Sequence, residues 1–506
     1  MNDIQRRLSQ RAADDYQAGK LTRREFLRRL AVISGGTVLG LTILGDLACA
    51  PSRNRRGSGQ VQSRLRSLSG ADPPPPDPPN ILFVVIDTLR ADHVSSYGYE
   101  RPTTPTIDRL AREGALFKMA VSTAPYTAPA HASLLTGLYP RQHGVQWTTR
   151  RPVLDSRHPT LPQVLRACGY RTAAFSANHF WFTREQGFGR GFARFEDAFS
   201  SPARVAMRTV YGHKIEDQII QRVVEDSPWR IGADDINRSV LGWLKGEPGR
   251  PFFAFLNYFD VHDPYLPPQP FRGQFSEREN PGGVINSYQE RFNPQMAPQQ
   301  LQEEINAYDG AIAYVDDRVA QLLERVRDLG LEENLLVVIT SDHGEAFGEH
   351  GLFLHPNSVY REEIHVPLVI WQPGRIPAGA RVSQPVSIAA LAATVMDLVD
   401  HQGPDPFPQR SLARFWEYRE APPEAAWPLV EMEHWNWWHP EAPCGRGGMQ
   451  SLISPEYHYI DHEVLGAELY DWRRDPGEVH NLADTPQGRT LVGEFRGLLQ
   501  RDYPPL

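Results

Sequence analysis

The chain has 506 residues and a formal net charge of −8, with 53 Lys and Arg against 61 Asp and Glu. This length suits one large domain with a smaller companion, because single hydrophobic cores rarely grow beyond about 250–300 residues. In the body of the chain no cluster of basic residues stands apart from its acidic neighbours, which argues against a nucleic-acid partner.

Residues 1–50 have the layout of a twin-arginine export signal. Arg23 and Arg24 precede an apolar stretch, residues 30–44, that several glycines interrupt. This stretch is short for a helix that spans a bilayer, which needs about 20 apolar residues. We therefore expect the twin-arginine export machinery to carry the protein to the periplasm or the cell surface. Cleavage near Cys49 and lipid attachment to Cys49 are both open, so a membrane tether through the N-terminus is open as well.

Residues 51–79 are rich in Arg, Ser, Gly and Pro and are interpreted as an extended linker. We divide the rest into a main domain, residues 80–409, and a C-terminal subdomain, residues 410–506. In chain order, the main domain is predicted to contain a strand at 81–86, helices at 106–113, 127–135 and 161–168, strands at 172–176 and 252–259, a helix at 298–329, strands at 335–340 and 366–371, and a helix at 388–399. This alternation favours an α/β fold with a mostly parallel sheet between helices.

After residue 409 the alternation of long strands and helices gives way to short apolar runs. Short apolar runs at 429–432, 449–454, 457–461 and 468–472 are followed by a helical pattern at 486–500. This predicts a small antiparallel sheet with one helix, which is an α+β subdomain.

Polar residues follow two of the predicted buried strands and open one predicted helix. Asp87 follows the strand at 81–86, Asp342 and His343 follow the strand at 335–340, and Thr127 opens a helix. In an open α/β sheet such places gather ligands, and a carboxylate with an imidazole suits a divalent cation. The segments therefore look like one metal site. The alternative for Thr127 is that it serves only as a helix N-cap.

These residues together resemble the sulfatases and their relatives in the alkaline phosphatase superfamily. In that family an Asp ends the first strand, a nucleophile opens a helix in a pattern that begins Cys/Ser-x-Pro-x-Arg and ends in Thr-Gly, and Asp-Asn or Asp-His follows a late strand. The resemblance runs from about Asn80 to Ala483 and includes Asp475-Pro476-Gly477-Glu478 near its end. It implies an alkaline-phosphatase/sulfatase-like fold in which Asp87, Thr127, Asp342 and His343 share one divalent cation.

The chain departs from the family pattern at four places. Sulfatases oxidise the Cys or Ser nucleophile to formylglycine, whereas this chain has Thr127, and His131 replaces the Arg of the pattern. Thr88 follows Asp87 where sulfatases have a second Asp, and His343 replaces an Asn. The last two changes remove a carboxylate and add a nitrogen donor, which shifts the expected ion from Ca²⁺ toward a transition metal. Mn²⁺, Zn²⁺, Mg²⁺ and Ca²⁺ all remain candidates.

Three histidines are candidates for contacting the substrate. By resemblance, His262 matches a substrate-binding His, and His355 lies where many sulfatases have a Lys or His that contacts the ester oxygen. His131 either donates to Thr127 or the substrate or has a structural role, and both interpretations are open. The expected mechanism is in-line attack by metal-bound Thr127 on phosphorus or sulfur, with His262 stabilising the oxygens and protonated His355 assisting the leaving alcohol.

The expected function is a metal-dependent hydrolase of sulfate or phosphate/phosphonate esters, acting on a small molecule or on a glycan or lipid headgroup. A sulfated threonine cannot collapse to an aldehyde as formylglycine does, so chemistry favours phosphate or phosphonate esters, whereas the resemblance favours sulfate esters. Two alternatives are a transferase of phospho-headgroups outside the cytoplasm and a non-catalytic sulfatase-like binding protein. Trp435, Trp437 and Trp438 form either a platform for a sugar or headgroup or a small satellite core.

Overall fold

The structure is a computed structural model that describes residues 78–146, 154–178, 180–197, 231–246, 249–276, 296–401, 403, 405–417, 427–435 and 439–503. The predicted export signal, residues 1–50, lies outside the described residues, as does the predicted linker except for its last two positions. Trp437 and Trp438 also lie outside them. No helix in the described ranges has both the length and the apolar character needed to cross a bilayer.

An eight-stranded sheet forms the centre of the main domain. In sheet order its strands are β12 (Ala380–Val382), β2 (Ala115–Phe117), β11 (Leu368–Trp371), β7 (Leu335–Thr340), β1 (Asn80–Ile86), β6 (Phe252–Tyr258), β4 (Arg171–Ser176) and β5 (Arg194–Glu196). Neighbouring strands from β7 to β5 are parallel, and only β11 runs antiparallel to its two neighbours. The predicted mostly parallel sheet is therefore confirmed.

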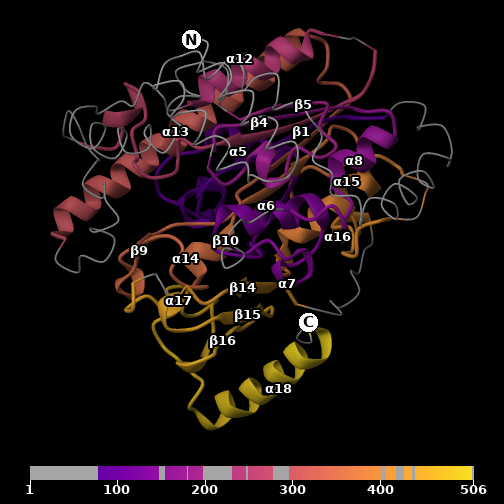
Figure 1. Cartoon of the computed structure of the whole chain (residues 1–506). Helices are drawn as coiled ribbons and strands as arrows, with labels where there is room; N and C mark the ends of the chain where they lie inside the picture. Colours follow the sequence, from indigo (N-terminus) through magenta and orange to yellow (C-terminus); the bar gives the residue numbers. More distant parts are fainter. Residues whose placement is uncertain are drawn as a thin grey trace, which may run out of the picture. The chain divides into compact units, whose positions relative to one another are not determined.

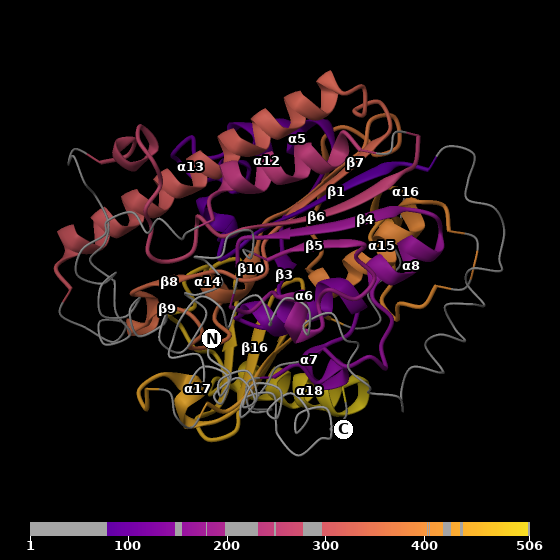
Figure 2. The same cartoon turned by 45° about the horizontal axis from the view of Figure 1, so that its top comes forward.

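Helices cover both faces of this sheet (Figures 1 and 2). One face carries α6 (Thr127–Thr136), α8 (Leu161–Ala167) and α15 (Leu391–Leu398), and the other carries α5 (Pro105–Glu113), α12 (Ala233–Leu244) and α13 (Pro298–Asp328). Successive side chains of a strand point to opposite faces. Phe83 of β1 accordingly lies in the core under α6, and Val84 lies in the core under α13. Burial on both faces explains why β1 is a continuous apolar run.

The C-terminal subdomain has the predicted antiparallel sheet and helix. Its strands are β14 (Leu429–Met432), β15 (Met449–Ile453), β16 (His458–His462) and β17 (Gly466–Tyr470), and its helix is α18 (Pro486–Asp502). Tyr459 and Leu469 of the sheet pack with Phe495 of α18 in one core. The exact border between main domain and subdomain at residue 409 stays a prediction.

Short elements connect these parts. They are β3 (Ala120–Val121), α7 (Pro140–His143), β8 (Ala346–Phe347), β9 (Phe353–Leu354), α14 (Arg361–Ile364), β10 (His365–Val366), β13 (Val386–Ser387), α16 (Arg414–Glu417) and α17 (Pro443–Arg446). The single strand predicted at 366–371 is wrong, because β10 pairs with β3 in a second sheet while β11 joins the main sheet. Pro367 separates the two strands, and its missing backbone N–H interrupts a ladder. Helix α12 was not predicted.

Candidate active site

Asp87, Asp342 and His343 come together at the carboxyl ends of β1 and β7. These strands are parallel neighbours, so the residues that follow them meet at one edge of the sheet. All three side chains are fully buried. His343 Nε2 lies 3.8 Å from Asp87 Oδ1 and 3.5 Å from Asp342 Oδ2. One ligand atom from each residue lies within 4.8 Å of the other two, and we call this set the first trio.

The hydrogen bonds of the first trio leave one nitrogen and two oxygen atoms with lone pairs that can bind a cation. His343 Nδ1 donates to the Gly344 carbonyl at 3.0 Å, which makes Nε2 the nitrogen with the lone pair. Asp87 Oδ1 and Asp342 Oδ2 are buried and have no hydrogen-bond partner. Buried carboxylate oxygens without partners are costly, so the three residues fit a divalent cation. A nitrogen with two oxygens is a donor set that transition metals accept.

The two carboxyl groups of the first trio differ in proton affinity. Burial raises the pKa of Asp87, and the neighbouring Asp342 raises it further. Burial also acts to raise the pKa of Asp342, but the adjacent His343 and His131 outweigh it and hold that pKa below its ordinary value. Asp87 is therefore the carboxyl group of the two with the higher proton affinity.

Thr127 is the first residue of α6. The N-cap of this helix is Tyr126, and no side chain caps it, so the alternative that Thr127 is only an N-cap is wrong. Thr127 is 2% exposed, and its Oγ1 lies 3.4 Å from His343 Nε2 and 3.5 Å from Asn178 Nδ2. The hydroxyl group thus lies beside the first trio and at the positive end of the helix dipole.

Two asparagines that the sequence analysis missed hold Asp87 in place. Asn178 lies two residues after β4, and its Nδ2 donates to Asp87 Oδ2 at 3.0 Å. Asn257 lies in β6, and its Nδ2 is 3.4 Å from the same oxygen, while its Oδ1 accepts from the Asn178 backbone N–H at 3.2 Å. A polar residue at the carboxyl end of a predicted buried strand was the signal that could have found both.

His131 lies on the buried side of the site and is fully enclosed. Its Nδ1 donates to the Thr127 carbonyl at 3.0 Å and lies 3.4 Å from Asp342 Oδ2. Its Nε2 accepts from Asn257 Nδ2 at 3.4 Å, and its ring packs on Phe182 with 4.4 Å between the ring centroids. His131 therefore contacts the backbone of Thr127 and not its hydroxyl group.

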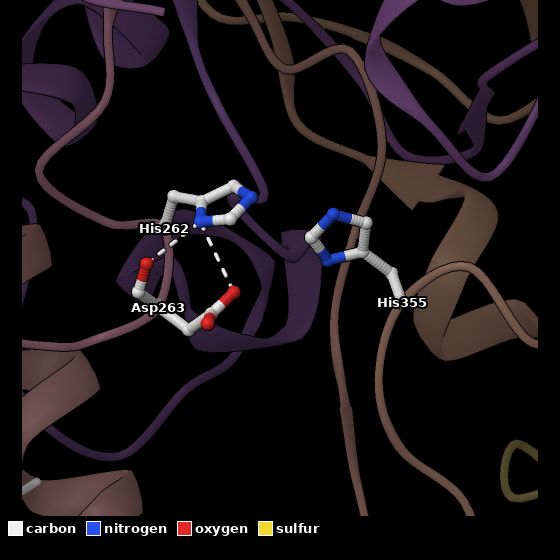
Figure 3. Close-up of side chains that lie close together, drawn as sticks. All are labelled: His262, Asp263 and His355. Atoms are coloured by element: carbon white, nitrogen blue, oxygen red, sulfur yellow. Dashed lines mark hydrogen bonds and ion pairs between the residues drawn. The ribbon is translucent and has the colours of Figure 1, made fainter. Parts of the chain in front are cut away.

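His262 and His355 face one another beside the first trio (Figure 3). Their ring centroids are 4.9 Å apart, with the planes at 85°. The His262 Nδ1 donates to the Asp263 carbonyl at 2.9 Å, and in Figure 3 its other ring nitrogen points toward His355. The ring of His355 lies 4.3 Å from that of His343. The structure thus places both histidines that the sequence singled out next to the candidate metal ligands.

Glu345 supports His355 and was also missed from the sequence. Its side chain is fully buried, its Oε1 accepts from His355 Nδ1 at 2.7 Å, and its Oε2 accepts from the Tyr265 hydroxyl at 2.9 Å. Gly344 before it allows a close approach of two chain segments, because a Cβ there would lie 2.0 Å from the Glu362 carbonyl oxygen. Glu345 is thereby fixed behind His355.

Two further predictions concern residues near the site. The Thr88 hydroxyl group donates to the Val261 carbonyl at 3.0 Å. Trp435 is buried, and its ring lies 5.2 Å from that of Tyr126, centroid to centroid. For Trp435 this packing favours the satellite core over a surface platform.

Comparisons with known proteins identify the family. A model of the family described as Sulfatase matches residues 79–401, well over half of the chain. The chain belongs to the sulfatase family. A second model, for the C-terminal region of N-sulphoglucosamine sulphohydrolase, matches residues 348–502.

Individual relatives of this sulfatase-family protein are distant. The uncharacterized sulfatase YidJ of Escherichia coli is 26% identical over 435 residues, which cover 80% of this chain and 83% of YidJ. The multifunctional alkaline phosphatase superfamily protein PehA of Trinickia caryophylli is 25% identical, covering 82% of this chain and 93% of PehA. The crystal structure of the phosphonate monoester hydrolase of Agrobacterium radiobacter has a TM-score of 0.67 at 22% identity, covering 85% of this chain and 96% of that one.

The family match confirms the resemblance, and the structural match confirms the fold class. As a sulfatase-family member, the chain is an ester hydrolase of the sulfuric-ester type. Members of this family depend on a metal ion, which agrees with the donor atoms of the first trio.

Proposed function

We propose that this protein hydrolyses sulfate or phosphate and phosphonate esters with Thr127 as its nucleophile and one divalent cation as its cofactor. The observation that carries the proposal is the location of the Thr127 hydroxyl, 3.4 Å from His343 Nε2 and next to two buried carboxylate oxygens without hydrogen-bond partners. A threonine hydroxyl is a weak nucleophile unless its surroundings lower its proton affinity.

The cation would be held by Asp87 Oδ1, Asp342 Oδ2 and His343 Nε2. A divalent cation there lowers the proton affinity of a nearby hydroxyl group and offsets the negative charge of the ester oxygens. The chain itself prepares this set, since Asn178 fixes Asp87 and the Gly344 carbonyl fixes the His343 ring.

The remaining roles follow from the hydrogen bonds of the two facing histidines. Thr127 Oγ1 releases its proton to solvent and attacks the phosphorus or sulfur atom, and the bond from that atom to the leaving oxygen breaks. His262 donates from Nδ1 to the Asp263 carbonyl, and it stabilises the anionic oxygens in the form in which its other nitrogen also carries a proton. His355, with Nδ1 held by Glu345, gives a proton to the leaving alcohol. Water then attacks the same atom and gives a proton to His355, which is now neutral, and the bond from that atom to Thr127 Oγ1 breaks.

The second half of this reaction decides between substrates. A sulfate or phosphate ester of threonine has no carbonyl form to collapse to, so water must attack sulfur or phosphorus. We therefore propose phosphate or phosphonate esters as the better substrates and sulfate esters as the poorer ones. The similarity to PehA, a protein described as multifunctional, supports a site that accepts more than one of these esters.

We also propose that the protein acts outside the cytoplasm. This rests on the Arg23-Arg24 pair and the short apolar stretch of residues 30–44. An ester on a small molecule, a glycan or a lipid headgroup would be accessible there.

A parallel assay tests the proposal. The full chain is given an aryl sulfate, an aryl phosphate, a phosphodiester and a phosphonate ester, each with Mn²⁺, Zn²⁺, Mg²⁺ or Ca²⁺. Thr127→Ala should abolish turnover. Thr136→Ala is the matched control, because Thr136 is equally buried on the same helix and its hydroxyl group bonds only to backbone, donating to the Ala132 carbonyl at 2.6 Å and accepting from the Leu138 N–H at 3.3 Å.

The outcomes separate the candidate functions. Loss of phosphoryl turnover in Thr127→Ala alone supports the proposed nucleophile and substrate, whereas loss of sulfate turnover alone supports the nucleophile and reverses the substrate preference. Full turnover by Thr127→Ala would show that the nucleophile is assigned wrongly. Metal binding without turnover of any ester would direct attention to the transferase and the binding protein.

A further inference from the structure

A second cluster of metal-ligand residues lies outside the active site. His350 belongs to the loop between β8 and β9, Glu362 to α14, and Glu478 to the segment between β17 and α18. One ligand atom from each lies within 4.8 Å of the other two. We call these residues the second trio. None of them contacts the first trio through its side chain in the interactions described above.

Glu362 is the member of the second trio that requires a partner. Its side chain is 6% exposed, and its Oε1 is buried without a hydrogen bond. Within the second trio, His350 Nε2 lies 3.8 Å from Glu362 Oε1, which is too far for a hydrogen bond. A buried carboxylate oxygen that lacks a hydrogen bond points to a ligand.

The nearby arginines do not hydrogen-bond to Glu362, although Arg361 Nε is itself buried without a hydrogen-bond partner. Arg90 donates to Asp92 through Nε and Nη2, and to Glu349 through Nη1 at 2.8 Å. Arg361 donates through Nη1 to the Pro476 carbonyl at 3.0 Å. Neither guanidinium group therefore hydrogen-bonds to Glu362 in the described structure.

The other two members of the second trio are oriented by their own contacts. Glu478 Oε1 accepts from His458 Nδ1 at 2.5 Å, and Glu478 Oε2 accepts from the Arg361 backbone N–H at 3.0 Å. The His350 ring stacks on Tyr360 with 3.8 Å between centroids and 9° between planes. Such support fixes ligands before an ion arrives.

We propose that His350, Glu362 and Glu478 bind a second divalent cation of the Zn²⁺ type. One imidazole nitrogen with two carboxylate oxygens is a common donor set for Zn²⁺, and water would complete a tetrahedron. At the usual Zn²⁺ bond lengths the ligand atoms of a tetrahedron are about 3.3 Å apart. The ligand atoms of the second trio lie within 4.8 Å of one another, with 3.8 Å between His350 Nε2 and Glu362 Oε1, so a tetrahedral site needs a contraction of at most about 1.5 Å.

The location of the second trio indicates a structural role. Glu478 belongs to the C-terminal subdomain, whereas His350 and Glu362 belong to the main domain. A shared cation would tie the loop before β9, which leads to His355, and helix α14 to the segment after β17. The second site is independent of the proposed reaction at Thr127.

Metal counting on the full chain tests this. The protein is loaded with Zn²⁺, desalted, and its zinc content is measured by mass spectrometry for wild type, Asp342→Asn, Glu362→Gln and the double variant. We expect two, one, one and no zinc ions per chain, respectively. His350→Asn should lower the affinity of the second site for zinc at least tenfold. His480→Asn is its matched control, because His480 lies in the same segment as Glu478 with its side chain 80% exposed, and this variant should keep both ions.

Two outcomes would overturn the second site. One is a zinc content in Glu362→Gln equal to that of wild type, and the other is a wild-type protein whose zinc is lost entirely in Asp342→Asn. If Glu362→Gln fails to fold, His350→Asn and a cobalt absorption spectrum of Asp342→Asn decide the question. A tetrahedral cobalt band in Asp342→Asn supports the site, and its absence refutes the site.

Discussion

Replacing Glu345 by Gln tests how the leaving alcohol receives its proton. Glu345 is fully buried, and its Oε1 accepts from His355 Nδ1 at 2.7 Å. The amide has the same shape, so its oxygen can still accept from His355 while its NH₂ group donates to the Tyr265 hydroxyl. The negative charge behind His355 is removed, and the Tyr265 hydroxyl group changes from donor to acceptor in its hydrogen bond.

The size of the effect follows from the change in this one hydrogen bond. A hydrogen bond to a charged group contributes about 1.5–3 kcal/mol, against about 0.5–1.5 kcal/mol for a neutral one. The difference, about 1.4 kcal/mol, corresponds to about a tenfold loss of kcat/KM when protonation of the leaving oxygen limits the reaction.

Two esters with the same acid part and different alcohols provide the assay. We expect about a tenfold loss for an alkyl ester, whose alcohol must be protonated, and less than about a threefold loss for a nitrophenyl ester, which leaves as an anion. Tyr265→Phe is the control, because it removes the hydroxyl group that donates to Glu345 Oε2 at 2.9 Å and keeps the charge. Equal losses for both esters in Glu345→Gln would refute the role of His355 as the acid.

Three further predictions concern the nucleophile, the support of the first trio and the acid stability. Thr127→Ser keeps a hydroxyl group on the same carbon and should retain kcat within about tenfold, whereas Thr127→Ala should lower it by at least about a thousandfold; similar rates for both variants would contradict nucleophilic attack. Asn178→Ala removes the 3.0 Å hydrogen bond to Asp87 Oδ2 and should weaken metal binding by about 10–100-fold in a calorimetric titration, so an unchanged affinity would count against this supporting role. Burial lowers the pKa values of His143 and His365 from 6.5 to about 3 in the folded state. The unfolded chain therefore binds more protons below pH 6.5, and each histidine should reduce the free energy of unfolding by about 1.4 kcal/mol for each pH unit between about 6 and 4. Urea unfolding at several pH values should show a shallower slope for His143→Gln than for wild type, and equal slopes would disprove this origin of the acid sensitivity.

The sequence by itself determined most of the long strands and helices and three central residues of the site, but not helix α12 or the short strands β2, β5 and β12 of the main sheet. Except at residues 366–371 and 388–399, the predicted strands and helices end within two residues of the observed ones, because apolar periodicity is a local property of the chain. At 388–399 the observed helix α15 begins after a 3-10 turn, Ile388–Ala390. Asp87, Asp342 and His343 could be assigned to one place because each lies within three residues of the end of a recognisable buried strand.

Only the tertiary structure decided which side chains surround Asp87, Asp342 and His343. Three of these side chains contact residues that are distant in the chain. Asn178 and Asn257 contact Asp87, and Glu345 contacts Tyr265. Asn178 and Asn257 reach Asp87 because β6 lies between β1 and β4, and Glu345 follows β7 on the other side of β1. No local pattern in the sequence predicts this order of strands. The same holds for the second trio, whose members come from three separate segments. Local patterns report whether a segment is buried, whereas pairing and side-chain contacts arise only when distant segments pack together.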